Sequence, residues 1–164
     1  MAQACAEERV KGKTVQPSEL ENYLHDHIPL SRAMQVSVLS VQDEVVVLAA
    51  PLAPNINHRD TVFGGSASAL AILSAWSLLH TRLARAGIAS RLVIQRNSMS
   101  YERPIDGAFT ARASLGSPQD WEHFTRMLAR KGKARITVAS VLEHDGQEAG
   151  LFAGEFVALR GHAD

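Results

Sequence analysis

The sequence predicts an α+β domain in which a curved antiparallel β-sheet wraps around one long central α-helix. Three observations predict this fold class. Residues 61–81 contain no Asp, Glu, Lys or Arg and are rich in alanine, so a helix there is apolar on nearly all sides and must be buried. The remaining segments are mostly predicted strands joined by short turns, which favours antiparallel pairing. A single apolar helix then packs on one face of the sheet, and curvature of the sheet buries it on most sides.

The N-terminal part is predicted to form a short helix and a strand pair. The helix opens at Pro17 and ends near His27, because the residue before Pro29 is disfavoured in helical geometry. Residues 34–52 then show alternating and continuous apolar runs, which predict two strands around a turn at Gln42-Asp43. These two strands are expected to pair as a hairpin.

The long helix is predicted over residues 64–86, after a loop at residues 53–60, with Gly87 as its C-cap. The rest of the chain is predicted as two strand pairs flanking a short helix: strands 91–101 and 108–115, a helix from Pro118 to Gly132, and strands 135–142 and 151–159. Asp106-Gly107 and Asp145-Gly146 are typical hairpin turns. Each strand pair is therefore expected to be a hairpin.

The composition is that of an ordinary single domain, with 164 residues, 46% hydrophobic and 21% charged. We expect a flexible tail at residues 1–16 and one domain at residues 17–164. A single cysteine, Cys5, excludes a disulfide framework and a Cys-rich zinc site and fits a cytoplasmic protein. The N-terminal residues lack the apolar run of a secretory signal. Residues 61–81 are long enough to span a bilayer, but their Gly, Ser and His content argues against a membrane protein.

The charges are unevenly distributed although the net charge is zero. Residues 59–135 hold 12 of the 17 Lys and Arg residues and 5 of the 17 Asp and Glu residues, a local excess of +7. Four cations in this region are candidate binding residues: Arg126, Arg130, Lys131 and Lys133. They suit the phosphates of coenzyme A or the acidic surface of an acyl carrier protein, or they simply solvate the surface. Nucleic acid is not expected, because no aromatic side chains are interleaved with them.

The most informative segment is the Asn-rich loop that leads into Gly64-Gly65-Ser66 at a helix start. A helix N-terminus offers unpaired backbone N–H groups and the positive end of the helix dipole. These donors stabilise a carbonyl oxygen that gains negative charge during a reaction, and Asn57 is placed to add a side-chain donor. The alternative is that the two glycines let the helix begin close to the sheet.

Other motifs for chemistry are weak. The sequence has neither a phosphate-binding G-x-x-x-x-G-K-[ST] loop nor a G-x-S-x-G nucleophile elbow. His25-x-His27 has no further ligand nearby, so no metal or other cofactor is expected. His58 and Asp60 in the Asn-rich loop are candidates for an acid or base, although His58 is equally suited to a turn.

Residues 55–66 (NINHRDTVFGGS), leading into an uncharged helix, resemble the hotdog-fold thioesterase superfamily. The resemblance is greatest to a group of putative thioesterases, the YiiD C-terminal domain family, and residues 97–107 (NSMSYERPIDG) and 154–159 (GEFVAL) share it. The similarity covers residues 17–159. It implies a hotdog fold, in which a curved sheet wraps a long helix. It also implies a dimer, or a dimer of dimers, with an acyl-thioester pocket at the subunit interface.

The resemblance also implies roles for individual residues. Asn57 corresponds to the loop asparagine and Gly65 to the backbone donor that polarises the thioester carbonyl. The expected substrate-binding residues are Asn55, Phe63, Gly64, Ser66 and Ser68. The chain departs from the pattern at Phe63, where many relatives have histidine, and at Asp60, where glycine is usual. The predicted central helix also lacks the Asp or Glu that many hotdog thioesterases use as nucleophile or base.

The resulting expectation is a cytoplasmic thioesterase acting on an acyl-CoA or acyl carrier protein thioester. Hydrolysis needs an activated water or a nucleophile, and Asp60 or His58 is expected to supply the activation. One alternative is decarboxylation of a malonyl thioester, a reaction linked to the family that needs donors for the enolate oxygen but no nucleophile. The other is a non-catalytic acyl-CoA-binding module.

Overall fold

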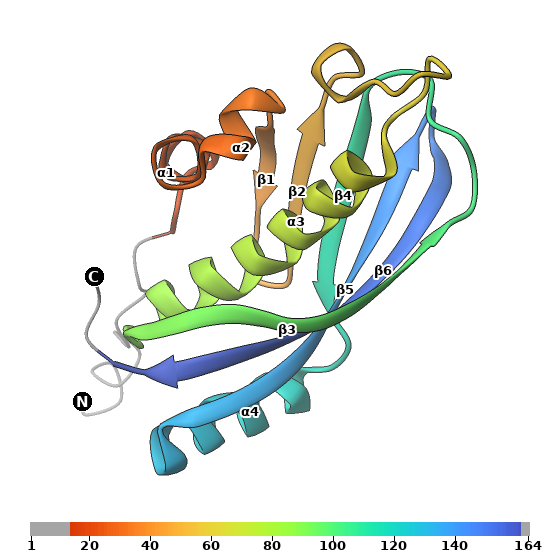
Figure 1. Ribbon diagram of the computed structural model, residues 1–164. Coiled ribbons are helices and arrows are strands. Elements are labelled where there is room, and N and C mark those ends of the chain that lie inside the picture. Colours follow the sequence, from red (N-terminus) through yellow and green to blue (C-terminus); the bar gives the residue numbers. More distant parts are fainter. Residues whose placement is uncertain (1–13, 162–164) are drawn as a thin grey trace, which may run out of the picture.

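Six antiparallel strands form one curved sheet around a long helix, in the order β1-β2-β4-β5-β6-β3 (Figure 1). The computed structural model describes residues 14–161, so most of the expected N-terminal tail lies outside the described residues. The helices are α1 (Pro17–His27), α2 (Pro29–Ala33), α3 (Gly64–Arg85) and α4 (Pro118–Lys131), with a 3-10 turn, η1, at Ala53–Asn55. The strands are β1 (Ser37–Val41), β2 (Val45–Ala50), β3 (Ser90–Tyr101), β4 (Phe109–Leu115), β5 (Lys133–His144) and β6 (Gln147–Arg160).

Helix α3 is the buried centre of the fold, as its uncharged sequence predicts. Half of its residues are buried, and its leucines belong to the same hydrophobic cluster as the inner faces of β2, β4, β5 and β6. Ser74 is also fully buried, where its hydroxyl donates to Ala71 O and bonds Ser140 Oγ of β5 at 2.8 Å. The helix ends as predicted, since Gly87 adopts φ +67°, a conformation that favours glycine. Within residues 14–161, no helix combines the length and hydropathy needed to cross a bilayer.

The first strand pair is confirmed, but it begins later than predicted. The strands β1 and β2 are antiparallel partners, with Ser37 opposite Ala49. The segment before them forms the additional short helix α2, which has proline at its first position. Met34 therefore ends a helix and does not begin a strand, and the next residue, Gln35, turns the chain at φ +56°.

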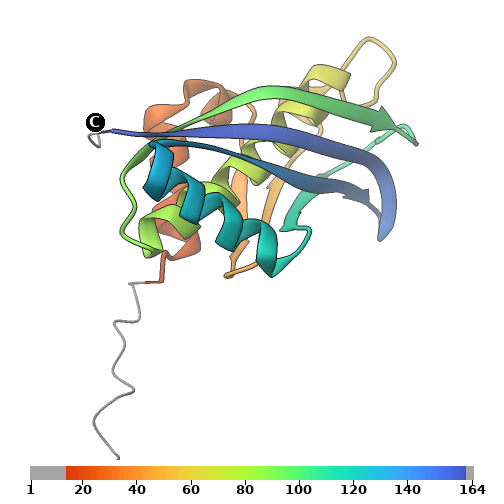
Figure 2. The same ribbon diagram turned by 90° about the horizontal axis from the view of Figure 1, so that it is seen from below.

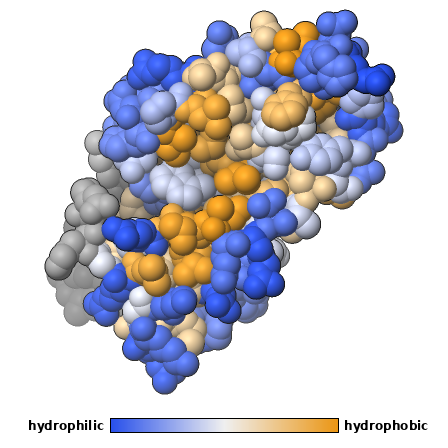
Figure 3. Space-filling view, in the orientation of Figure 1, coloured by the Kyte–Doolittle hydropathy of each residue, from blue (hydrophilic) through white to orange (hydrophobic). Residues whose placement is uncertain are grey.

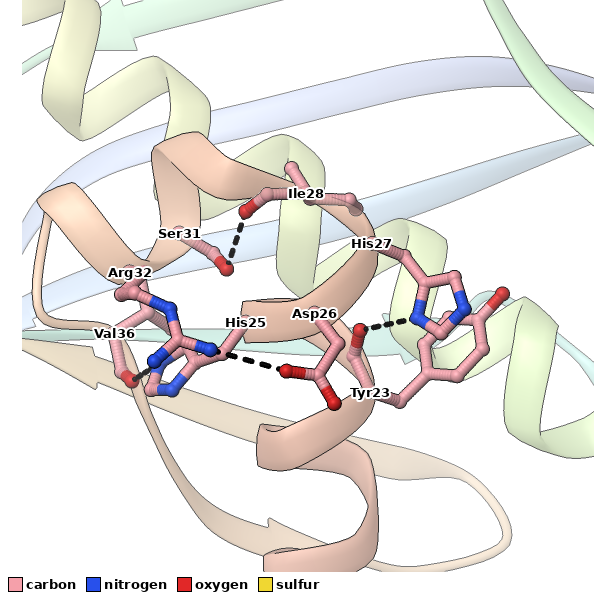
Figure 4. Close-up of polar contacts among 8 residues, drawn as sticks. All are labelled: Tyr23, His25, Asp26, His27, Ile28, Ser31, Arg32 and Val36. Atoms are coloured by element: carbon pink, nitrogen blue, oxygen red, sulfur yellow. Dashed lines mark hydrogen bonds and ion pairs between the residues drawn. The ribbon is translucent and has the colours of Figure 1, made fainter.

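Polar contacts fasten α1 and α2 together and hold them to the following segment (Figure 4). His25 Nε2 bonds Val36 O at 2.8 Å, whereas His27 Nδ1 bonds Tyr23 O at 2.9 Å on the other side of α1. Arg32 of α2 donates to Asp26 Oδ1 at 3.0 Å. His25 and His27 thus bond different backbone carbonyls and do not converge on a shared site.

A stack of four rings docks α1 on α3. The Tyr23 ring lies between those of His27 and His80, with centroid distances of 4.1 and 4.8 Å, and the His80 ring stacks on Trp76 at 4.5 Å. Trp76 Nε1 donates to Leu92 O of β3, which ties the helix to the edge strand. Burial, and to a smaller extent the proximity of His27, lowers the pKa of His80. A neutral His80 ring is compatible with this apolar stack.

The predicted hairpin between β3 and β4 is wrong. The strand β3 pairs only with β6, from Ser90 opposite Arg160 to Tyr101 opposite Gly150. The strand β4 lies three places away, between β2 and β5. Residues 102–108, which contain Asp106-Gly107, therefore cross the end of the sheet and do not make a tight turn. The Asp-Gly signal marked a change of chain direction, but it did not determine which strands pair.

The second predicted hairpin is confirmed. The strands β5 and β6 pair along almost their whole length, and Asp145 and Gly146 between them have φ values of +50° and +70°. Two successive residues with positive φ are typical of a two-residue hairpin turn. Helix α4 is also confirmed: Ser117 caps its start, Gly132 ends it at φ +69°, and Phe124 and Leu128 are its buried residues.

A histidine–aspartate latch holds the crossover segment against the β5–β6 turn. His144 bonds Ala108 O through Nδ1 at 2.7 Å and Asp106 Oδ1 through Nε2 at 2.8 Å, with Asp145 Oδ2 at 3.4 Å. A Cβ atom at Gly107 would lie only 2.8 Å from the His144 ring, so glycine permits the close approach. The hydrogen bonds to Ala108 and Asp106, with the nearby Asp145 charge, raise the pKa of His144 above 6.5.

We expect this latch to make stability depend on pH. Because the folded-state pKa is raised, its stabilisation is complete below pH 6.5 and is lost as the pH rises through the folded-state pKa. Urea unfolding from about pH 5 to about pH 8 should show the wild type losing its advantage over a His144→Gln variant as pH increases. A difference between the two proteins that is constant with pH would contradict the latch.

Candidate functional site

The start of α3 presents backbone donors beside a cavity. The first hydrogen bond that closes the helix runs from Ala67 N to Phe63 O at 3.0 Å. The N–H groups of Gly64, Gly65 and Ser66 precede it and so have no partner within the helix. Phe63 at the N-cap position provides no side-chain cap. These three donors lie at the positive end of the helix dipole, which suits a developing oxyanion.

Asn55 fastens the loop that enters α3. Its side chain is 1% exposed, and Nδ2 donates to Met34 O and Pro51 O at 3.0 and 2.8 Å. Its backbone oxygen accepts a hydrogen bond from Phe63 N at 2.8 Å. The structure therefore places Asn55 behind the helix start, where it sets the position at which α3 begins.

Asn57 organises the next turn of the same loop. Its Nδ2 group donates to Thr61 Oγ1 at 3.0 Å and Val62 O at 3.4 Å, and its Oδ1 atom accepts from Arg59 N at 2.8 Å. Ile56 and Val62 form a β-bridge beneath this turn. In the structure, the Asn57 amide is thus used within the loop that leads to the helix start.

His58 and Asp60 lie exposed at the tip of this loop, which projects beyond the sheet (Figure 2). Asp60 adopts φ +60°, in the left-handed region where glycine is favoured. Among the described residues, neither side chain has a hydrogen bond or ion pair. The structure does not bring either group onto the first turn of α3.

Two aromatic rings flank the glycines of the helix start. Phe63 is 58% exposed, yet its ring covers Gly65 so closely that a Cβ atom there would lie 2.3 Å from it. Tyr101, at the end of β3, contacts Gly64 and donates its hydroxyl to Gly64 O at 3.2 Å. The two glycines therefore permit aromatic walls directly beside the unpaired N–H groups.

A cavity of about 290 Å³ adjoins the helix start. Its lining combines an apolar floor with a polar rim: Val62, Gly64, Ala67, Tyr101, Glu102, Arg103, Pro104, Ile105, Leu142 and Ala149. Glu102 is exposed and accepts a hydrogen bond from Ser100 Oγ at 2.5 Å, and Arg103 donates to Gln147 Oε1 at 2.6 Å. A carboxylate residue and a guanidinium residue thus line the same cavity as Gly64, the first residue of α3.

Sequence reasoning missed Glu102, Arg103 and Tyr101 as site residues. All three lie within residues 97–107, a segment that carried the family resemblance, so a signal was present. Their role was not evident because they are more than 35 residues from Gly64 in the chain, and the predicted β3–β4 hairpin gave no reason to place them at the helix start. Only the pairing of β3 with β6 brings them there.

Ser66 and Ser68 are half-buried on the first two turns of α3. The partly exposed side of this helix continues through Ile72 and Trp76 and faces the edge strand β3. Figure 3 shows an apolar band over α3 and β3 on this face of the molecule. The partly exposed side of α3 thus runs from the candidate oxyanion donors toward the contact of Trp76 with β3.

The basic residues of α4 lie far from this site. Lys131, Lys133, His123 and Arg135 line a groove of about 520 Å³ with Met127 and Ala134, and Arg126 and Arg130 are exposed on the same helix. Leu142, which lines the cavity, follows Lys133 by nine positions on strand β5, about 30 Å of extended chain at ~3.3 Å per residue. The groove and the helix start are at opposite ends of β5 (Figure 1).

Comparison with known proteins identifies the family. A family model described as putative thioesterase (yiiD_Cterm) matches residues 17–160. The chain belongs to this family. The YiiD C-terminal family assignment agrees with the resemblance seen in the loop and helix start.

Similar solved structures confirm the hotdog fold of this YiiD C-terminal family member. A protein of unknown function from Chlorobaculum tepidum is 27% identical, with a TM-score of 0.84, covering 90% of this chain and 99% of that chain. A putative thioesterase from Shewanella oneidensis is 26% identical, with a TM-score of 0.78, covering 87% and 96%. A thioesterase from Haemophilus influenzae shares the fold at 11% identity and a TM-score of 0.73, covering 91% and 94%.

Proposed function

We propose that this protein hydrolyses an acyl thioester carried by coenzyme A or an acyl carrier protein. The observation that carries the proposal is the row of unpaired N–H groups at Gly64–Ser66 beside a cavity with an apolar floor. In this proposal the Gly65 N–H donates to the thioester carbonyl oxygen and stabilises the oxyanion that forms when water attacks. Asn57 and Asn55 hold the loop that positions this donor, and Phe63 walls the site.

Glu102 is the proposed general base. It lines the cavity that contains Gly64, and α3 itself carries no carboxylate. The carboxylate accepts a proton from water as the water oxygen bonds to the carbonyl carbon. The C–S bond of this intermediate then breaks, and the protonated Glu102 returns the proton to the leaving thiolate. Asp60 and His58 are alternative bases. Either could act only if the loop tip that carries them reaches the site of another subunit.

Decarboxylation of a malonyl thioester is the second candidate function. The absence of an acidic residue from α3 favours it, because this reaction needs no nucleophile and no base. The Gly65 N–H would stabilise the enolate oxygen while carbon dioxide leaves. Arg103 at the rim of the same cavity, together with the Ser66 and Ser68 hydroxyls, would orient the substrate carboxylate.

A second copy of the chain is the proposed partner in a cytoplasmic homodimer. The edge strand β3 is 12 residues long and pairs with another strand on one side only, so its other side is open to a further strand. Pairing there would also cover the apolar band of Figure 3. The basic groove of α4 is proposed to bind the phosphates of coenzyme A or an acidic carrier protein, away from the acyl end.

Mass spectrometry of malonyl and simple acyl thioesters, on coenzyme A and on carrier protein, tests the proposed function. Release of a free thiol and a carboxylic acid is the expected result and shows hydrolysis. Conversion of malonyl to acetyl thioester, with the thioester intact, would replace hydrolysis with decarboxylation. Tight binding without turnover of any substrate would favour the third function, a non-catalytic acyl-CoA-binding module.

A further inference from the structure

We propose that His144 is a positioning residue for the candidate site, because it holds the crossover segment that forms one wall of the cavity. The crossover segment, residues 102–108, carries four of the residues that line this cavity: Glu102, Arg103, Pro104 and Ile105. His144 itself is not one of the lining residues. The inference rests on the proposed thioester function and adds a residue outside the cavity on which the geometry of the site depends.

The latch fixes the C-terminal end of the crossover segment. The His144 ring bonds Ala108 O through Nδ1 at 2.7 Å and Asp106 Oδ1 through Nε2 at 2.8 Å. The His144 side chain is only 14% exposed, and its ring lies 2.8 Å from the position that a Cβ atom of Gly107 would occupy. Three consecutive residues of the crossover segment therefore pack against one ring.

The N-terminal end of the crossover segment is attached to the same β5–β6 hairpin. The register of β5 against β6 shifts between Leu142 and Glu143, which leaves Ala149 as the extra residue of a β-bulge. The Ala149 oxygen accepts hydrogen bonds from the N–H groups of Glu102 and Arg103, at 2.9 and 3.1 Å. The proposed base therefore begins a segment whose two ends are both fastened to one hairpin.

Between these two attachments, the crossover segment supports the entry to α3. Ile105 is 5% exposed, lines the cavity and directly precedes Asp106 of the latch. Its backbone oxygen accepts a hydrogen bond from Val62 N at 2.8 Å. Val62 lies three residues before Gly65, the proposed donor to the thioester carbonyl. The latch is thus connected to both sides of the site, the wall that carries the proposed base and the loop that enters the helix.

Both hydrogen bonds of the latch require the protonated ring. A neutral imidazole has one N–H group, so it can donate to Ala108 O or to Asp106 but not to both. The charged groups that face the ring are Asp106 of the crossover segment and Asp145 of the turn, whose Oδ2 lies 3.4 Å from Nε2. The bonds to Ala108 and Asp106, with a smaller contribution from the Asp145 charge, raise the pKa of His144. Two bonds therefore hold the wall below this pKa, and one bond holds it above.

Kinetics of His144→Gln, with His25→Gln as the matched control, test the inference. His25 also bonds a backbone carbonyl, Val36 O at 2.8 Å, but it fastens α1 and lies outside the cavity lining. At about pH 6, where the latch is protonated, His144→Gln should lower kcat for thioester hydrolysis by about 10- to 10²-fold, since a misplacement of roughly 1 Å costs as much. His25→Gln should keep the wild-type kcat. Calorimetric affinity for a non-hydrolysable S-alkyl-CoA should change little in either variant.

The pH profile of kcat distinguishes positioning from a general loss of stability. The wild-type kcat should fall as the pH rises through the pKa of His144, because the latch then loses one hydrogen bond. The profile of His144→Gln should lack this fall. Thermal unfolding identifies the pH range in which all three proteins remain folded. The same fall in His144→Gln would overturn the inference, as would a wild-type kcat in this variant.

Amide hydrogen exchange tests the role of His144 without turnover. The Val62 N–H group, which bonds Ile105 O, should exchange about 2- to 10-fold faster in His144→Gln than in the wild type, as for a weakened hydrogen bond. Its exchange in His25→Gln should equal that of the wild type. Unchanged exchange at Val62 in His144→Gln would overturn the inference. If the wild type turns over no thioester, the proposed function fails, while the exchange comparison still decides whether His144 holds the wall.

Discussion

Replacing Glu102 by glutamine is expected to lower kcat for thioester hydrolysis by about 10²- to 10⁴-fold, the usual contribution of a general base. Glutamine keeps the size of the side chain and its capacity to accept the Ser100 hydrogen bond, but it does not accept a proton from water. Binding of a non-hydrolysable substrate analogue should remain close to that of the wild type. Steady-state kinetics with the best acyl thioester, together with calorimetric binding, measure both quantities.

Glu122→Gln is the matched control for this experiment. Glu122 is exposed on α4 and lies outside the cavity, so its removal changes the net charge equally without touching the site. Its turnover should equal that of the wild type. If Glu102→Gln still hydrolyses thioesters at the wild-type rate, Glu102 is not the general base. Asp60 and His58 would then be the next residues to replace. Persistent conversion of malonyl to acetyl thioester in this variant would support decarboxylation, which needs no base.

Replacing Gly65 by proline is expected to reduce kcat by about 10²- to 10³-fold, as for loss of one oxyanion donor. Proline lacks the backbone N–H, and the first turn of a helix tolerates it because this N–H has no helical partner. The new side chain displaces the exposed Phe63 ring, which covers Gly65 in the wild type. Circular dichroism and thermal unfolding establish that α3 is retained before kinetics are compared.

The Gly65→Ala variant distinguishes the effect of losing the backbone N–H from the effect of displacing the Phe63 ring. Alanine displaces the same ring, since its Cβ atom would also lie 2.3 Å from it, but it keeps the N–H group. We expect this variant to retain most of the turnover that Gly65→Pro loses. Similar losses in the two variants would show that the position of Phe63, and not the backbone donor, matters for catalysis.

Much of the fold could be predicted because its signals are local. The uncharged run before Arg82 predicted a buried helix, and the structure buries half of α3. Gly87 and Gly132 end their helices with positive φ, a conformation that is costly for other residues. Asp145-Gly146 likewise formed the expected hairpin turn. Each of these outcomes depends on the conformational preferences of one short segment.

The partners of the strands could not be predicted in the same way. The segment around Asp106-Gly107 has the local character of a turn, yet it carries the chain across the sheet from β3 to β4. The choice between β4 and β6 as partner of β3 depends on which arrangement best covers α3, and no single segment encodes that. The helix α2 was missed because a helix of five residues, the first of them proline, shows too little periodicity to be recognised.

The sequence by itself determined the long buried helix, its glycine-rich start and the loop that enters it. These features follow from hydropathy, backbone preference and short-range hydrogen bonds such as those of Asn57. Only the tertiary structure decided what lies beside that helix start. The pairing of β3 with β6 brings Tyr101 and Glu102 to the cavity that Gly64 lines, and the bulge after Ile94 turns Asn97 to the inner face of the sheet. The same structure separates the basic residues of α4 from the site, because β5 is extended and its two ends lie far apart.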